Sequence, residues 1–348
     1  MSGGYHPWSK FNAHRWSDLN ARRQPSFFCA KSASDAVAAC ESITDSAEHV
    51  AVVDCSQLKY VDPFGIALLG ATFHIVQLQG RQIQVLNLSA NLQGYLTRMD
   101  VFKDVKLVGD CPVAVGTRHD RSTDLVELTC LDDKNQVDDA AFRLAKTIVG
   151  KLDGIDLKEP PDEMSGMNLA DRLAEPIQYA LSELLENALT HARRGGYQSS
   201  KVWVASQYYP RSGAIHLGVV DDGCGFLRSL EAHPSLKHKR DHEAILLALQ
   251  PRVSCNRDQW LSQPDSVNQG VGLTTTSRMA EKSGGRMVIV SGGAMHDTSG
   301  RTGVLSSGAY WQGVAIALEC QRNRLSEFRV SELLPPYDAK PPVALRFE

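Results

Sequence analysis

Residues 183–192 read Glu183-Leu184-Leu185-Glu186-Asn187-Ala188-Leu189-Thr190-His191-Ala192, a stretch with the pattern of a helix. Glu183 and Asn187 lie four residues apart in a helical pattern, so their side chains project from one face. Apolar residues recur at helical spacing on another face, which we expect to be buried: Ile177, Leu181, Leu184 and Ala188. The sequence therefore predicts a helix that presents a carboxylate and an amide to a ligand.

Two glycine motifs follow this helix. Asp221-Asp222-Gly223-Cys224-Gly225 comes directly after residues 214–220, whose apolar run predicts a buried strand. Gly270-Val271-Gly272-Leu273 opens a helical stretch that ends near Gly284-Gly285, and residues 286–291 then predict another strand. The start of a helix offers free backbone N–H groups and the positive end of the helix dipole, which together suit a phosphate. The glycines indicate where the backbone comes close to the ligand.

In this order, the helix and the two glycine motifs resemble the nucleotide-binding domain of the GHKL (histidine-kinase/gyrase-like) superfamily. That superfamily includes gyrase, chaperones, sensor histidine kinases and anti-sigma-factor serine kinases. The resemblance covers roughly residues 122–320 and implies an α/β two-layer sandwich of the GHKL (Bergerat) ATPase type. It also implies that ATP and Mg²⁺ are the ligands of the site.

The resemblance implies a role for each motif residue. Asn187 matches the Mg²⁺-binding asparagine, and Glu183 matches the general base that polarises an attacking water or hydroxyl. Asp221 matches the carboxylate that accepts a hydrogen bond from the adenine amino group, whereas we expect Asp222 to face solvent or a water near the base. The other expected nucleotide-binding residues are Gly223, Gly225, Gly270, Gly272 and Leu273.

Residues 226–269 lie where the superfamily has its ATP lid. The basic side chains of this segment are either phosphate contacts or an ordinary charged surface: Lys237, Lys239, Arg240, Arg252 and Arg257. One departure is Gly313-Val314, which stands where a Gly-Thr pair often enters the last strand of the superfamily. The sequence has no Gly-x-x-x-x-Gly-Lys-Ser/Thr and no full Gly-x-Gly-x-x-Gly after a strand, which argues against a P-loop and against a dinucleotide-binding fold.

Length and composition predict a cytoplasmic protein with two domains of moderate size. The chain has 348 residues and a net charge of −3, so charge gives no argument for nucleic acid or an anionic membrane as a partner. No apolar run approaches the ~20 residues that span a bilayer. The eight cysteines are scattered without a Cys-x-x-Cys pair, which is typical of reduced thiols. We therefore expect a cytoplasmic protein with no nucleic-acid or membrane partner.

The first third of the chain alternates strand and helix signals, which predicts an α/β layer with a mostly parallel sheet. We expect strands at 27–30, 49–54 and 82–88, and helices at 34–43, 65–78 and 90–99. A further strand over 125–131 and a helix over 136–152 belong with the second domain. We expect a flexible extension over residues 1–23 and a C-terminal tail over 321–348.

Residues 24–118 resemble a STAS domain, the anti-anti-sigma-factor fold. The resemblance rests on Val52-Val53-Asp54-Cys55-Ser56, on Tyr60-Val61-Asp62-Pro63-Phe64-Gly65 and on Gly80 before a strand. The turn of that family usually carries a serine or threonine after the aspartate, which a GHKL kinase phosphorylates, whereas this chain has Pro63 and Phe64. We therefore expect the domain to act by contact with a protein partner. Phe64 is either an exposed anchor for that partner or part of the core.

Three functions remain open at this point. The first is an ATP-binding regulator with slow hydrolysis or ATP-dependent switching, in which the STAS-like domain is a docking module. The second is a protein serine/threonine kinase of the anti-sigma type that acts on a separate STAS protein. The third is a non-catalytic module that binds ATP. We prefer the first, because the chain joins the STAS-like domain to the ATPase without a target serine. A homodimer is an option for the assembly.

Overall fold

The computed structural model describes residues 22–23, 25–109, 118–150, 160–164, 166–251, 253, 272–327 and 333. These residues form a mixed α/β fold with three sheets: one of seven strands, one of three and one of two. The mixed α/β class predicted from the sequence is confirmed.

The seven-stranded sheet is antiparallel throughout and has the order β11-β10-β9-β12-β8-β7-β6. At its centre, Val219 of β8 pairs with Ile316 of β12 on one side and Val204 of β7 on the other. The strands are β6 (Leu125–Leu131), β7 (Val202–Tyr209), β8 (Ala214–Asp221), β9 (Arg286–Gly292), β10 (Ala294–Asp297), β11 (Arg301–Val304) and β12 (Trp311–Gln321).

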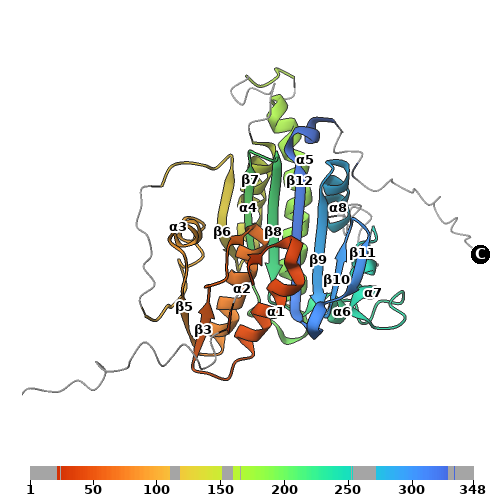
Figure 1. Ribbon diagram of the computed structural model, residues 1–348. Helices are drawn as coiled ribbons and strands as arrows, with labels where there is room; N and C mark the ends of the chain where they lie inside the picture. Colours follow the sequence, from red (N-terminus) through yellow and green to blue (C-terminus); the bar gives the residue numbers. More distant parts are fainter. Residues whose placement is uncertain are drawn as a thin grey trace, which may run out of the picture.

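Three helices cover one face of this sheet: α4 (Val137–Val149), α5 (Leu169–Ala192) and α8 (Gly272–Lys282). Asn168 begins α5 with a capping box, because its side chain accepts from Asp171 N at 2.8 Å while the Asp171 carboxylate accepts from Asn168 N. The apolar face of α5 is buried as the sequence predicts, with Ile177, Leu181 and Leu184 in the core. Two short helices, α6 (Gly225–Ser229) and α7 (Asp241–Ala248), lie at one end of the sheet (Figure 1).

The N-terminal layer is the part of the chain up to residue 109. Its strands pair in parallel as predicted, in the order β1-β3-β5 and as the separate pair β2-β4. Asp62 begins α2, because its side chain accepts from Gly65 N at 2.9 Å. The elements are β1 (Arg22–Arg23), β2 (Phe27–Phe28), α1 (Ala33–Thr44), β3 (Val50–Asp54), β4 (Tyr60–Val61), α2 (Pro63–Leu78), β5 (Gln82–Leu86) and α3 (Ala90–Arg98).

Helix α2 packs on the second face of the seven-stranded sheet, over β7 and β8 (Figure 1). It is apolar around most of its circumference, which is the composition of a helix buried on all sides. The contact is closest at Gly218 of β8, where an added Cβ would lie 2.5 Å from the Pro63 carbonyl oxygen. One hydrophobic core therefore runs from the small sheet through α2 to Trp203, Val220 and Ala315 of the large sheet. The expected two-layer arrangement accounts for one face only, since the N-terminal layer covers the other.

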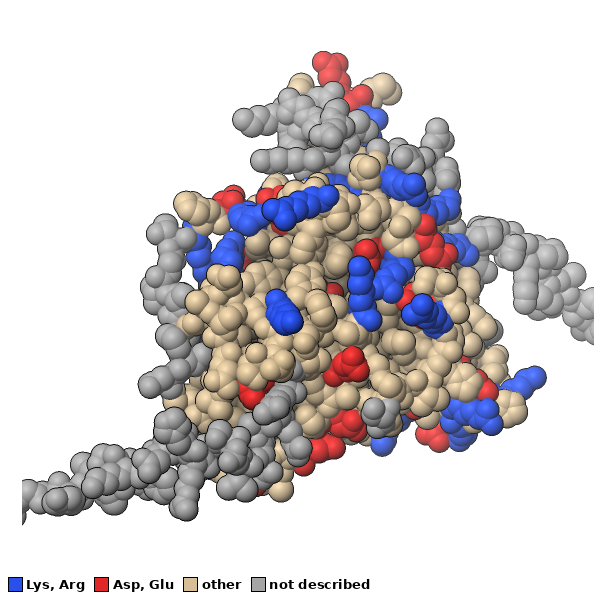
Figure 2. Space-filling view, in the orientation of Figure 1, with Lys and Arg blue, Asp and Glu red and all other residues tan. Residues whose placement is uncertain are grey.

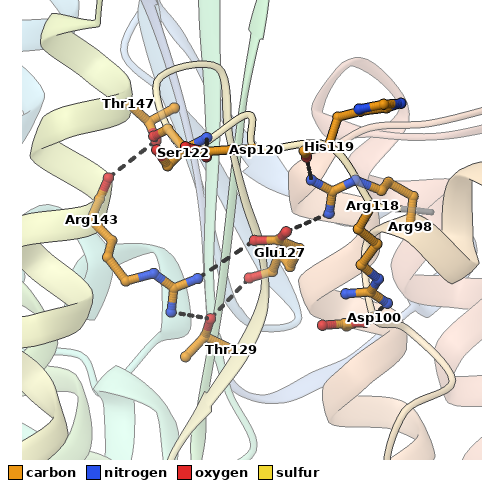
Figure 3. A network of polar contacts seen from close by, with 10 residues as sticks. All are labelled: Arg98, Asp100, Arg118, His119, Asp120, Ser122, Glu127, Thr129, Arg143 and Thr147. Atoms are coloured by element: carbon orange, nitrogen blue, oxygen red, sulfur yellow. Dashed lines mark hydrogen bonds and ion pairs between the residues drawn. The ribbon is translucent and has the colours of Figure 1, made fainter.

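A polar network joins the N-terminal layer to the edge of the large sheet (Figure 3). Glu127 of β6 is bonded to Arg98 at the end of α3 and lies 3.5 Å from the guanidinium of Arg143 on α4. Arg118 pairs with Asp100 and also donates to the Thr97 carbonyl oxygen at 3.3 Å. These cations are paired with carboxylates, so the network connects the layers and is not a free basic surface.

Two predicted chain ends are shorter than expected. Residues 22–23, placed in the flexible extension, form β1 and pair with β3. The predicted tail from 321 is wrong for its first residues, because Gln321 belongs to β12 and a 3-10 helix follows over Arg322–Glu327. The buried Arg322 guanidinium explains this order, since it donates to the Thr147 carbonyl oxygen at 2.7 Å and lies 3.4 Å from the centre of the Tyr208 ring.

None of the described helices is long and apolar enough to cross a membrane. On the face of the molecule that Figure 2 shows, Lys and Arg occur together with Asp and Glu, separated by wide uncharged areas.

Candidate functional site

A pocket of about 540 Å³, open to solvent, lies between α5, the large sheet and the start of α8. Apolar side chains line its walls, and four polar side chains converge on it: Asn187, His191, Asp221 and Ser229. The other lining residues are Leu184, Ala188, Ala192, Val219, Gly225, Phe226, Leu273, Val314 and Ile316.

Asp221 ends β8 with its side chain in this pocket. Successive residues of a strand point to opposite faces, so Val219 and Asp221 face the pocket while Gly218 and Val220 face α2. The carboxylate is buried and accepts from Gly223 N at 2.9 Å. Burial raises the pKa of Asp221 to about 7, and the neighbouring Asp222 adds to the rise, while backbone hydrogen bonds from Gly223 and Val314 oppose it. The group therefore changes charge near neutral pH.

Asp222 points to the other side of the sheet, toward the N-terminal layer. Its Oδ2 lies 2.9 Å from Nδ1 of His74 on α2, and its Oδ1 accepts from Lys201 N at 2.9 Å. The side chain is 3% exposed. The expectation that Asp222 faces solvent or a water near the base is wrong, because strand alternation turns it away from the pocket and α2 covers it.

The predicted glycines lie where backbones approach one another. An added Cβ on Gly223 would lie 2.3 Å from Ala192 Cα, and one on Gly272 would lie 2.8 Å from Leu184 N. These glycines set the first turn of α8 and the end of β8 directly against α5. Gly225 has φ +70°, a left-handed conformation that favours glycine, and it lines the pocket. Gly270 lies outside the described residues.

Glu183 and Asn187 share one face of α5, as the spacing predicts, but they are placed differently. Asn187 lines the pocket, whereas Glu183 lies one turn nearer the start of α5, beside Gly272 and outside the lining residues. Burial raises the pKa of the Glu183 carboxyl, with Glu186 as a smaller contribution. Glu186 is exposed and pairs with Lys134 at 3.1 Å. Leu273 lines the pocket as expected.

His191 is a pocket residue that the sequence reasoning missed. It lies four residues after Asn187, and this spacing on one helix face was the available signal. Burial lowers the pKa of His191 to about 4, and Arg194 adds to the effect, so the ring is neutral at neutral pH. The ring adds a neutral polar group to the same wall as Asn187.

The expected lid is described over residues 226–251 and at 253. Thr274 Oγ1, on the first turn of α8, donates to the Leu249 carbonyl oxygen at 3.0 Å and so joins α8 to the end of the α7 segment. Lys239 pairs with Glu231 at 3.0 Å, and Lys237 and Arg240 are exposed. None of these three cations lines the pocket among the described residues. Arg252 and Arg257 lie outside the described residues.

No group of three His, Cys, Asp or Glu side chains able to hold a metal occurs in the part of the chain that the structure describes. Asn187, the one residue predicted as a metal ligand, lines the pocket, and an amide oxygen is a ligand type that Mg²⁺ accepts. One neutral oxygen cannot hold the ion by itself. The donor set fits a Mg²⁺ that takes its remaining oxygens from phosphates and water.

The turn Asp62-Pro63-Phe64-Gly65, at the start of α2, lies on the opposite face of the large sheet from the pocket. Phe64 is 1% exposed and belongs to the core shared by α2 and the large sheet. Of the two alternatives for Phe64, the exposed anchor is therefore wrong, and the core interpretation is confirmed. The physical reason is the close contact between Gly218 of β8 and the first turn of α2.

In comparisons with known proteins, no family model matches the chain, and no curated protein matches its sequence.

Proposed function

We propose that this protein is an ATP-binding regulator that holds Mg-ATP in a GHKL-type site and uses it for slow hydrolysis or conformational switching. The observation that carries the proposal is the buried Asp221 carboxylate, which faces the same pocket as Asn187. A buried carboxylate at the end of a strand is costly, and a ligand that donates a hydrogen bond to it offsets that cost.

Adenine is the base that suits this wall of the pocket. Its amino group is a donor where guanine presents an acceptor oxygen, so a carboxylate acceptor favours adenine. Val219 and Ile316 supply apolar surface from the sheet, and Leu184 supplies it from α5. A flat aromatic base between these side chains would bury its faces while its polar edge meets Asp221.

The phosphates are expected on the side of Asn187 and the start of α8. The first turn of α8 offers backbone N–H groups and the positive end of the helix dipole. When Mg²⁺ is bound, it supplies charge neutralisation for the phosphates. Asn187 would hold the ion through its amide oxygen, and Gly272 permits α8 to approach α5 at this point.

Glu183 is the proposed general base. Burial raises the pKa of its carboxyl, which strengthens it as a proton acceptor once ionised. It lies outside the lining of the pocket. We therefore propose that it orients and deprotonates an attacking hydroxyl at the phosphate end, away from the base.

The runner-up is a serine/threonine kinase that acts on a separate STAS protein. The turn of this chain cannot be its own target, because Pro63 and Phe64 carry no hydroxyl and the turn lies across the sheet from the pocket. The third option is a module that binds ATP without turnover. We favour the regulator, because a helix of the N-terminal layer contacts the strand that ends in Asp221.

Calorimetric titration tests the binding proposal. Wild type should bind Mg-ATP more tightly than Mg-GTP, and Asn187→Ala should weaken Mg-ATP binding because it removes a metal ligand. Glu186→Ala is the matched control, since Glu186 lies beside Asn187 but is exposed and paired with Lys134. Equal affinity for ATP and GTP, or equal binding by the Asn187 variant and wild type, would contradict the assignment.

Incubation with γ-labelled ATP separates hydrolysis, transfer to a protein and binding without turnover. Release of labelled phosphate supports a hydrolysing regulator, and label on a lysate protein supports a kinase. Tight binding without either result supports a switch or a non-catalytic module.

A further inference from the structure

We propose that the N-terminal layer sets the nucleotide affinity of the pocket through the contact between His74 and Asp222. This inference rests on the proposed function, because it concerns the regulation of the same site. His74 lies on α2 and Asp222 directly follows Asp221, so the contact joins the N-terminal layer to the proposed adenine-binding turn.

The contact is partly buried and directional. His74 Nδ1 donates to Asp222 Oδ2 at 2.9 Å, while Asp222 Oδ1 accepts from Lys201 N at 2.9 Å. The carboxylate is 3% exposed, and the imidazole is 20% exposed. Trp203 of β7 lies beside the imidazole, with 5.0 Å between the ring centres. A hydrogen bond to a buried carboxylate is among the stronger ones that a folded protein makes.

The backbone of the turn is held from β12. Trp311 Nε1 donates to the Asp221 carbonyl oxygen at 3.0 Å, and Gln312 Nε2 donates to the Asp222 carbonyl oxygen at 3.1 Å. Gly223 N is held by the Asp221 carboxylate itself. With its backbone fixed in this way, the turn has little freedom to absorb a change at Asp222 without moving Asp221.

Strand alternation gives the two carboxylates opposite tasks. Asp221 faces the pocket, and Asp222 faces α2, with one peptide unit between them. A displacement of α2 that breaks the His74 contact leaves a buried carboxylate without one of its donors, and this destabilises the turn that also carries Asp221. The position of α2 and the occupancy of the pocket are therefore coupled. By reciprocity, nucleotide binding stabilises the docked position of α2.

The predicted consequence is a route for regulation from the N-terminal layer. Anything that shifts α2 on the sheet changes the affinity for Mg-ATP without touching the pocket. In this arrangement the layer acts on the site through the sheet, and the nucleotide in turn changes how firmly α2 is held.

Three variants test the coupling. His74→Ala removes the donor, and we expect it to weaken Mg-ATP binding by about 5- to 10-fold, within the usual range for coupled sites. His74→Asn keeps a side-chain N–H near the position of Nδ1 and should restore most of the affinity. Tyr95→Phe is the matched control, because it removes another hydrogen bond between the layers, the one from Tyr95 to Gln207 Oε1 at 2.6 Å, away from the pocket. Its affinity should equal that of wild type.

Hydrogen exchange provides a second measurement for the same variants. Without ligand, the backbone amides of residues 221–225 should exchange faster in His74→Ala than in wild type or Tyr95→Phe. With Mg-ATP, exchange in α2 should slow in wild type and change less in His74→Ala. These two results support the coupling even if His74→Ala lowers overall stability.

The inference is overturned if His74→Ala binds Mg-ATP like wild type, or if Tyr95→Phe weakens binding to the same extent. The second result would mean that any loosening of the layers affects the pocket. Failure of the proposed function looks different, because wild type itself would then show no preference for Mg-ATP.

Discussion

Asp221 is buried, and burial raises the pKa of its carboxyl from 3.8 to about 7. Between about pH 4 and about pH 7, the folded protein therefore keeps this carboxyl protonated, whereas the unfolded chain has already released the proton. The contribution of Asp221 to stability is present below about pH 4 and falls as pH rises to about 7. Replacing Asp221 with Asn removes this titration and keeps an oxygen acceptor for Gly223 N.

We therefore predict that Asp221→Asn gains stability relative to wild type as pH rises. The difference in the free energy of unfolding between variant and wild type should increase by on the order of 4 kcal/mol from about pH 4 to about pH 8. Denaturant titrations at both pH values measure it. A constant difference across this range would mean that Asp221 is ionised normally in the folded protein.

The same substitution should act in the opposite direction on binding. The Asn side chain can place a donor opposite the adenine amino group, and an unmatched buried polar group costs about 1–3 kcal/mol, or roughly ten- to a hundred-fold in affinity. Calorimetry at neutral pH measures this loss. A variant that is more stable at high pH yet binds ATP as tightly as wild type would remove Asp221 from the adenine site.

Glu183 and Asn187 should separate turnover from binding. Because Glu183 lies outside the lining of the pocket, Glu183→Ala should bind Mg-ATP nearly as wild type does. If Glu183 is the general base, any turnover of ATP should fall by about 10²–10⁴-fold. Single-turnover assays beside calorimetry check both parts. Normal turnover in Glu183→Ala would exclude it as the base.

At the scale of elements, the approach of α8 to α5 positions the phosphate end of the pocket. Gly272→Ala adds a Cβ 2.8 Å from Leu184 N and 3.0 Å from Glu183 Cβ, which would push the helices apart. We expect a loss of about 1–3 kcal/mol of stability and weaker Mg-ATP binding. Gly94→Ala in α3 is the control, because nothing lies within 4 Å of its added Cβ. Its stability should rise slightly, since alanine favours a helix.

The helix–sheet contact at α2 gives a second prediction on this scale. Phe64 is fully enclosed between the layers, so Phe64→Ala should cost roughly 3–5 kcal/mol of stability. Thermal and chemical unfolding measure it. If Phe64→Ala were as stable as wild type and had lost only the binding of a protein partner, Phe64 would be a surface contact and not part of the core.

Many elements could be predicted from the sequence, because their signals are local. The span of β6 agrees with the predicted 125–131, and α1, α2, β3 and β9 lie within a few residues of their predicted ranges. Strand β7 and the hairpin of β10 and β11 were missed, although Val202 to Tyr209 is rich in β-formers. The packing of α2 on β8 was missed for another reason. An apolar helix signals that it is buried and does not say against which sheet.

In the candidate site too, local features could be predicted from the sequence, whereas contacts between distant residues could not. The superfamily resemblance indicated Asn187 and Asp221 as residues that face a ligand, and both line the pocket. The sequence did not reveal His74 as the partner of Asp222, because the two residues are 148 positions apart and meet only through the packing of the layers. The predicted strand ended at residue 220, whereas β8 ends at Asp221. With the correct end, the alternation of side chains along a strand would have predicted that Asp222 points away from the pocket.

At the scale of the whole molecule, one core continues across the expected domain boundary. A chain with a shared core should unfold in one cooperative step, although its length would accommodate two independent domains. We predict a single calorimetric transition whose van't Hoff and calorimetric enthalpies agree. Two separated transitions would show that the N-terminal layer and the large sheet are stable without each other.

A crystal structure with Mg²⁺ and a non-hydrolysable ATP analogue at saturating concentration would show directly whether this pocket binds the nucleotide. We predict the adenine amino group at Asp221, the Mg²⁺ at the amide oxygen of Asn187 and the phosphates toward the first turn of α8. An analogue bound elsewhere, or a pocket between α5 and β8 that stays empty in those crystals, would contradict it.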